Sequence, residues 1–137
     1  DRLICLGDII YRGAQAVELF EYLTDIKADF VLGNHEHLML EALLTNDTEA
    51  LKLWSANGGA WHATADSFKL NHICDVVLSQ SLSLLLKYRD KTIGLSHTLP
   101  PSWDWNKLSQ NKEYLIESLL WSRELYKSQK LYNNMRL

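Results

Sequence analysis

The chain has 137 residues and a formal net charge of −3 at pH 7, with 47% apolar and 23% charged residues. This length suits one domain or part of one, and the composition is typical of a globular protein with a hydrophobic core. The negative charge gives no general attraction to nucleic acid or to a membrane surface, so any phosphate group must be bound by local arginines or a metal ion. No apolar run is long enough to cross a membrane and no signal peptide is visible, so we expect a cytoplasmic protein.

The first thirty residues or so predict a βαβ unit. Residues 2–6 are a short apolar run that stops at Gly7, as expected of a buried strand. Residues 16–23 carry apolar side chains at helical spacing, and residues 30–32 form the next apolar run before Gly33. Strand, helix and strand over this length favour two neighbouring parallel strands.

The rest of the chain is predicted to contain helices and one hairpin. The expected helices cover residues 36–44, 47–54, 61–77 and 112–126. Asn46 or Asp47 is the N-cap of the second, and the break after it is Asn57-Gly58-Gly59. Residues 82–88 and 92–95 flank a polar turn and predict a β-hairpin. Cys5 and Cys74 are too few for a disulfide framework and are predicted to be buried free thiols in a reducing compartment.

Polar residues follow three of the predicted strands. Asp8 lies two residues past the first strand, Asn34 and His35 follow the second, and His97 follows the hairpin. Ligands of open α/β sheets bind beyond the carboxyl ends of the strands, so we expect these side chains at one edge. Carboxylate, carboxamide and imidazole donors together favour a divalent ion such as Mn, Fe or Zn.

Two arginines complete this polar inventory. Arg12 lies four residues after Asp8, and Arg123 lies in the predicted last helix. A guanidinium group binds the outer oxygens of a phosphate through two parallel hydrogen bonds. The sequence therefore predicts a metal site that holds and cleaves a phosphate ester.

Four segments resemble the calcineurin-like metallophosphoesterase superfamily. They are Asp1-Arg2-Leu3-Ile4 running into Gly7-Asp8, then Gly33-Asn34-His35-Glu36, then Asn57-Gly58-Gly59-Ala60-Trp61, then Leu120-Trp121-Ser122-Arg123. The resemblance is closest to the phosphoprotein phosphatases of the bacterial and bacteriophage lambda type, and it spans essentially the whole chain. It implies an α/β sandwich of two central mixed β-sheets flanked by helices. Residues 1–137 would be one such domain, incomplete at both ends.

The resemblance also implies a role for each matching residue. Asp8 would bridge two metal ions, Asn34 and His97 would bind the second ion, and His35 would be the general acid. Arg12 and Arg123 would bind the phosphate, and Glu36 would support the metal ligands from behind. A metal-bound hydroxide would attack phosphorus in line, with Mn as the expected metal and Fe or Zn as alternatives. The implied substrate is a phosphoprotein or phosphopeptide carrying phosphoserine or phosphothreonine, or else phosphotyrosine, with no particular oligomeric state indicated.

Three departures from the family pattern affect this expectation. The family's Asp-x-His motif should precede Asp1, and its Gly-His motif should follow the end of the chain, so the ligand set here is incomplete. Tyr11 stands where the family has an Asp that hydrogen-bonds the general acid, and a phenol orients an imidazole without supplying charge. We therefore expect the chain alone to be inactive or nearly so.

Two other functions remain open on the sequence. The same fold serves hydrolases of dinucleotide polyphosphates such as diadenosine tetraphosphate. Tyr11 also fits a pseudo-phosphatase that keeps both arginines and binds phosphate without cleaving it. Among the aromatic residues, core positions are expected for Trp54, Trp61 and Trp121, whereas Trp103 and Trp105 are either loop residues or part of a substrate cleft. His37, His62 and His72 are assigned to the surface or to helix packing.

Overall fold

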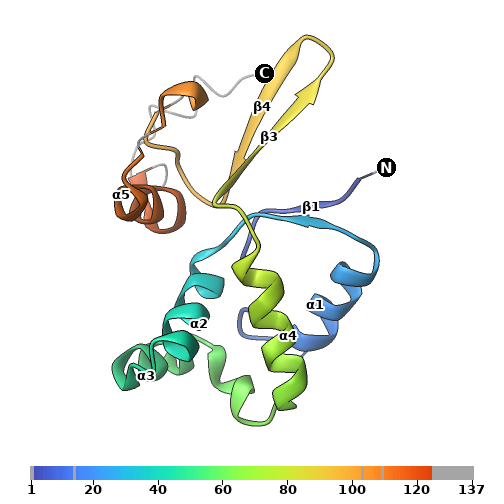
Figure 1. The fold of residues 1–137 in the computed structure, drawn as a ribbon, viewed down its shortest axis with the longest axis vertical. Coiled ribbons are helices and arrows are strands. Elements are labelled where there is room, and N and C mark those ends of the chain that lie inside the picture. The colour runs from blue at the N-terminus through green and yellow to red at the C-terminus, as the bar shows by residue number, and fades with distance from the viewer. Residues whose placement is uncertain (1, 14, 103, 109, 125–137) are drawn as a thin grey trace. The chain divides into compact units, whose positions relative to one another are not determined.

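A computed structural model describes residues 2–13, 15–102, 104–108 and 110–124 (Figure 1). The chain divides into two compact units, Asp1–Ser81 and Leu82–Leu137, and each is described by itself. Within the described ranges, every helix is too short or too polar to cross a bilayer.

The first unit opens with the predicted βαβ arrangement. Strand β1 (Ile4–Cys5) pairs in parallel with β2 (Asp29–Phe30), and helix α1 (Ala16–Asp25) connects them. Both strands are shorter than predicted. After β1 the backbone turns away because Gly7 and Asp8 have positive φ angles of 89° and 57°. Beyond β2, the Val31 N–H donates to the Cys5 carbonyl at 3.0 Å, and Val31 forms an isolated parallel bridge with Ser81.

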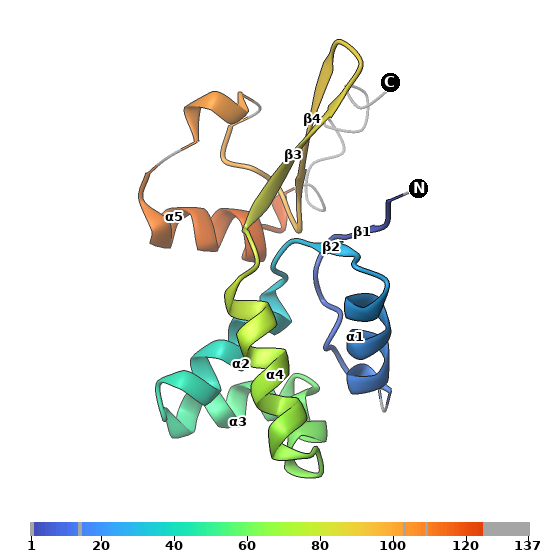
Figure 2. The same ribbon diagram turned by 45° about the vertical axis from the view of Figure 1, so that its right-hand side comes forward.

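Three further helices complete the first unit, and Figures 1 and 2 both show α2 beside α4. Helix α2 spans Asn34–Leu44, α3 spans Thr48–Ala56, and α4 spans Ser67–Leu78. Asp47 caps α3 as predicted, since its Oδ1 accepts a hydrogen bond from the Glu49 N–H at 2.8 Å.

The helix predicted over residues 61–77 is confirmed only from residue 67 onward. The chain forms a 3₁₀ turn, η1 (Gly59–Ala63), and starts again at α4. Asp66 is the physical reason, because its side chain caps α4 by accepting from the Phe68 N–H at 2.9 Å and the Lys69 N–H at 3.1 Å. A residue whose side chain occupies these donors sits at a helix start and not in its interior.

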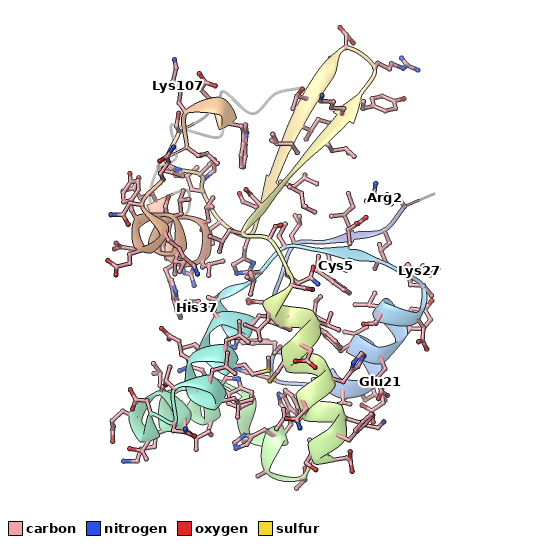
Figure 3. All side chains as sticks on the ribbon, viewed as in Figure 1. Arg2, Cys5, Glu21, Lys27, His37 and Lys107 are labelled. Atoms are coloured by element: carbon pink, nitrogen blue, oxygen red, sulfur yellow. The ribbon has the colours of Figure 1, made fainter. Side chains whose placement is uncertain are left out.

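The hydrophobic core of the first unit joins α1, β2, α2, α3 and α4. Its fully buried side chains include Phe20, Val31, Met39, Trp54, Ile73 and Val77. An ion pair between Glu21 on α1 (labelled in Figure 3) and Lys69 on α4, 2.8 Å apart, lies at the edge of this core. The predicted burial is confirmed for Trp54 and Cys74, whereas Trp61 and Cys5 are only half-buried.

The second unit contains the predicted hairpin. Strands β3 (Ser83–Tyr88) and β4 (Lys91–Ser96) pair antiparallel in register from Ser83↔Ser96 to Tyr88↔Lys91. A short 3₁₀ turn, η2 (Trp105–Lys107), follows, and the Trp105 indole lies against Gly94, where an added Cβ would overlap the ring. Trp103 lies outside the described residues.

The last predicted helix is shorter than expected. Helix α5 (Lys112–Ile116) continues as a π-helical turn, η3 (Glu117–Trp121), and then Ser122 adopts an extended ψ of 134°. The helix therefore ends before Arg123, and residues 125–126 of the predicted helix lie outside the described part. Trp121 is not a core residue, because it lies at the last position of this turn and 36% of it is exposed. The fold is mixed α/β with two small sheets, and the sandwich of two mixed sheets stays a prediction.

Candidate functional site

The buried carboxylate of Glu36 joins the loop after β1 to the start of α2. Its Oε2 accepts from the backbone N–H of Asp8 at 2.8 Å and of Gly33 at 2.9 Å. Its Oε1 accepts from the N–H of Ile9 at 2.7 Å and of Ile10 at 3.1 Å. Glu36 is only 3% exposed, so these four bonds replace its lost hydration. The role of Glu36 in supporting metal ligands stays a prediction, and the structure shows that its carboxylate accepts hydrogen bonds from the loop that carries Asp8.

Asp8 lies directly against the N-terminus of α2. Its Oδ1 accepts a hydrogen bond from the His35 N–H at 3.2 Å, and a Cβ added to Gly33 would lie 2.5 Å from the same oxygen. The positive end of a helix favours a carboxylate at this place. Asn34 and His35 are the first two residues of α2, and each is 6% exposed. Residues 26 or more positions apart in the sequence are thus brought to one place.

Tyr11 connects His35 to Arg12. The rings of Tyr11 and His35 meet edge to face with centroids 4.1 Å apart. The Arg12 guanidinium carbon lies 4.9 Å from the centre of the Tyr11 ring, which is cation–π distance. Tyr11 therefore restrains both neighbours through its ring, where a carboxylate would have added a negative charge.

The second unit holds the other two predicted residues. His97 directly follows β4 and is half-buried, and Thr98 ties this strand end to η3 because its N–H donates to the Leu119 carbonyl at 2.8 Å. Arg123 is exposed, with a long contact of 3.4 Å from Nη1 to the Ser122 carbonyl. The structure thus brings together six of the eight predicted residues within the first unit: Asp8, Tyr11, Arg12, Asn34, His35 and Glu36.

A divalent metal fits the donor chemistry of this cluster only in part. Asp8 offers a carboxylate and Asn34 a carboxamide, which are oxygen donors suited to hard and borderline ions. Gly33 permits the close approach of the Asp8 carboxylate, because a side chain at this position would overlap Asp8 and Glu36. Within the described ranges, however, no three His, Cys, Asp or Glu side chains converge as a set of ligands.

One neighbour of the cluster was not predicted to belong to it. Gly58, in the turn after α3, lies against the Arg12 side chain, and a Cβ added there would be 2.3 Å from the Arg12 Cγ. The sequence marked Asn57-Gly58-Gly59 as a break and as a segment of family resemblance. The pair of adjacent glycines was the one sign in the sequence that this turn contacts other residues closely, since glycine is common where other groups approach the backbone.

Comparison with known proteins identifies the family. The sequence model described as calcineurin-like phosphoesterase matches residues 1–134. The chain belongs to the calcineurin-like phosphoesterase family. This result confirms the family that the four sequence segments predicted.

Curated relatives agree with this assignment. The chain is 31% identical over 133 residues to serine/threonine-protein phosphatase 2 of Escherichia coli (strain K12), a match that covers 96% of this chain and 54% of that protein. It is 28% identical over 132 residues to serine/threonine-protein phosphatase 1 of Salmonella typhimurium strain LT2, covering 90% of this chain and 56% of that protein. The chain thus spans about half the length of the curated relatives it matches.

Proposed function

We propose that this chain contributes to a metal-dependent phosphomonoesterase whose substrates are phosphoserine and phosphothreonine in proteins. The family assignment and the names of the relatives support the reaction and the substrate class. The observation that carries the proposal is the fixed cluster in the first unit, where Glu36 holds Asp8 against the start of α2. Two free cysteines, Cys5 and Cys74, fit a reducing compartment, which supports the cytoplasm as its location.

Each residue of the cluster has a different role in the proposed reaction. Asp8 and Asn34 would hold a divalent ion, with Mn first and Fe or Zn as alternatives. Such an ion, when bound, lowers the pKa of a water ligand and polarises a phosphoryl oxygen. His35 donates a proton to the leaving alkoxide oxygen, and Arg12 binds the outer phosphate oxygens. His97 and Arg123 are proposed as a further metal ligand and phosphate ligand on the family resemblance.

Binding of Mn²⁺ by the purified protein tests the metal part of the proposal. The hexaaqua Mn²⁺ signal in electron paramagnetic resonance falls as the ion binds. We expect Asp8→Asn to weaken Mn²⁺ binding by about tenfold or more, since one charged oxygen ligand is lost. Glu18→Gln removes an exposed carboxylate on α1 that is not one of the predicted site residues, and it should leave binding unchanged. Equal affinity of the wild type and Asp8→Asn would contradict the assignment of Asp8.

Substrate class is tested by phosphate release from a phosphoserine peptide and from diadenosine tetraphosphate, each with added Mn²⁺. We expect faster release from the peptide, and the reverse order would favour the dinucleotide polyphosphate reading. Chelation with EDTA should stop the release, and Mn²⁺ in excess should restore it.

The contact of Tyr11 with His35 favours one second candidate, a protein that binds phosphate esters without cleaving them. An aromatic ring holds the imidazole in place but does not raise its proton affinity as a carboxylate would. Losing general-acid help typically costs about 10²–10⁴-fold in rate. Tyr11→Asp should therefore raise turnover if Tyr11 limits the rate, whereas Tyr11→Phe should leave it unchanged. Phosphopeptide binding with no turnover in either variant would favour the binding protein.

A further inference from the structure

The turn between α3 and η1 packs directly against the side chain of Arg12. A Cβ added to Gly58 would lie 2.3 Å from the Arg12 Cγ and 3.2 Å from its Cα and Cβ. We propose that Gly58 is a positioning residue, which holds the Arg12 side chain in the orientation that binds a phosphate monoester. This inference rests on the phosphate-binding role proposed above for Arg12.

Only glycine meets both demands at this position. The φ angle of Gly58 is 114°, which side chains of L-residues rarely adopt, and the space above its Cα is filled by Arg12. A distance of 2.3 Å is far below a carbon–carbon contact, so a larger residue must push the arginine or the turn aside. Rotation of the arginine side chain would move Cγ away, but the added atom would still lie 3.2 Å from the Arg12 Cα, which is a tight contact.

The turn is also fixed from its other side, so it cannot retreat. A Cβ at the next residue, Gly59, would lie 2.4 Å from the indole of Trp54, which is fully buried. The His62 ring stacks on Trp54 with centroids 4.7 Å apart, and its Nδ1–H donates to the Gly59 carbonyl at 2.6 Å. The two glycines therefore lie between the core tryptophan and Arg12. Because Gly59 packs on Trp54, the position of Gly58 beside Arg12 is fixed by the core.

The charged end of Arg12 is left available for a ligand. Its guanidinium lies over the Tyr11 ring and is exposed, and no carboxylate of the described residues forms an ion pair with it. Contacts with carbon orient the side chain, whereas its N–H donors are not used by a protein carboxylate. A guanidinium that is already oriented loses less conformational freedom when it binds an anion, which strengthens binding. The chemical class that fits is a phosphate monoester dianion.

A double-mutant cycle tests whether Gly58 acts through Arg12. Thermal unfolding is measured for the wild type, Gly58→Ala, Arg12→Ala and the double variant. The left-handed φ strains alanine in both backgrounds, but the overlap with Cγ disappears when Arg12 is truncated. We therefore expect Gly58→Ala to lower the unfolding midpoint by several degrees, and by about half as much in the Arg12→Ala background. Gly13→Ala is the matched control, because its added Cβ has only ordinary contacts, the nearest at 3.8 Å.

Binding of phenyl phosphate, measured by calorimetry with Mn²⁺ present, supplies the second readout. We expect Gly58→Ala to weaken binding about tenfold, the value of one charge-assisted hydrogen bond, and to have less than about a twofold effect once Arg12 is alanine. Gly13→Ala should bind within about twofold of the wild type. Gly58→Asn tolerates a left-handed φ better and keeps the overlap, so it replaces Gly58→Ala if that variant does not fold.

The outcomes separate this inference from the proposed function. Equal effects of Gly58→Ala in both backgrounds, in unfolding or in binding, would show that Gly58 does not act through Arg12 and would overturn the inference. A coupled unfolding cycle together with unchanged phenyl phosphate binding in Arg12→Ala, or with no binding by the wild type, would instead overturn the phosphate role of Arg12. The packing of Gly58 on Arg12 would then stand without a function in phosphate binding.

Discussion

Replacement of Glu36 by glutamine is the sharpest test of what holds the candidate site together. The two side chains have nearly the same shape, but glutamine replaces one acceptor oxygen by an NH₂ group that only donates. Each carboxylate oxygen of Glu36 accepts from two backbone N–H groups. Whichever way the amide is turned, two buried N–H groups lose their acceptor and face another donor.

The expected cost follows from these two lost acceptors. An unsatisfied buried donor costs about 1–3 kcal/mol, so the loss of two acceptors in Glu36→Gln should destabilise the protein by about 2–6 kcal/mol. Proteins of this kind have a total free energy of unfolding of about 5–15 kcal/mol, so the variant should be visibly less stable or partly unfolded. The loop that carries Asp8 is the segment released, and Mn²⁺ binding should weaken with it.

Urea unfolding followed by tryptophan fluorescence measures this cost, since Trp54 is fully buried in the same unit. Glu41→Gln is the matched control on the same helix. Its side chain is half exposed and lies 3.7 Å from His37, so its loss should change stability by no more than about 0.5 kcal/mol. A Glu36→Gln protein within about 0.5 kcal/mol of the wild type would refute the reasoning, because the backbone N–H groups would then have other acceptors.

Four further predictions concern a buried tryptophan, a partly exposed tryptophan, a helix cap and an ion pair. Trp54→Ala should cost about 3–5 kcal/mol in urea unfolding, because a fully buried ring is removed. Trp121→Ala should cost about 1 kcal/mol or less, because much of that ring is exposed. Asp47→Ala should cost about 1 kcal/mol through loss of the α3 cap, and a cost near zero would contradict the capping role. Arg2, whose guanidinium donates to Asp29 at 2.7 Å, lowers the pKa of that carboxyl, so its contribution is present above about pH 4 and is lost as the pH falls. Unfolding of wild type and Arg2→Gln should therefore differ at pH 6 and converge near pH 2, and a difference that persists at pH 2 would contradict the assignment.

Local patterns predicted most of the secondary structure because they are set by nearby residues. The βαβ unit and the hairpin were predicted correctly, since apolar runs bounded by glycine or by a polar turn specify strands without distant information. The predictions failed where one residue outweighed a periodic pattern. Asp66 starts a new helix within the predicted helix of residues 61–77, and the extended backbone of Ser122 ends the last helix early.

In the candidate site, the sequence predicted which residues take part but not the contacts between them. Asp8, Asn34 and His35 could be chosen from the sequence, because each follows an apolar strand and carries a donor atom. The contact of Gly58 with Arg12 could not be predicted, since it joins positions 46 residues apart and depends on how the turn after α3 packs on Trp54. The Glu36 carboxylate was assigned a supporting role by resemblance, but its four backbone donors follow only from the folded loop.

The cluster fixes its anionic and cationic groups by different means. Four backbone N–H groups donate to the two oxygens of Glu36, so this buried carboxylate has hydrogen-bond partners without an ion pair to Arg12. Arg12 is oriented by contacts with carbon, from the Tyr11 ring and from Gly58, and no carboxylate of the described residues forms an ion pair with it. Had a carboxylate oriented the arginine, a phosphate would first have to displace it, and the strength of that ion pair would be subtracted from the affinity. An arginine held by carbon is therefore the arrangement expected where the ligand itself must supply the negative charge.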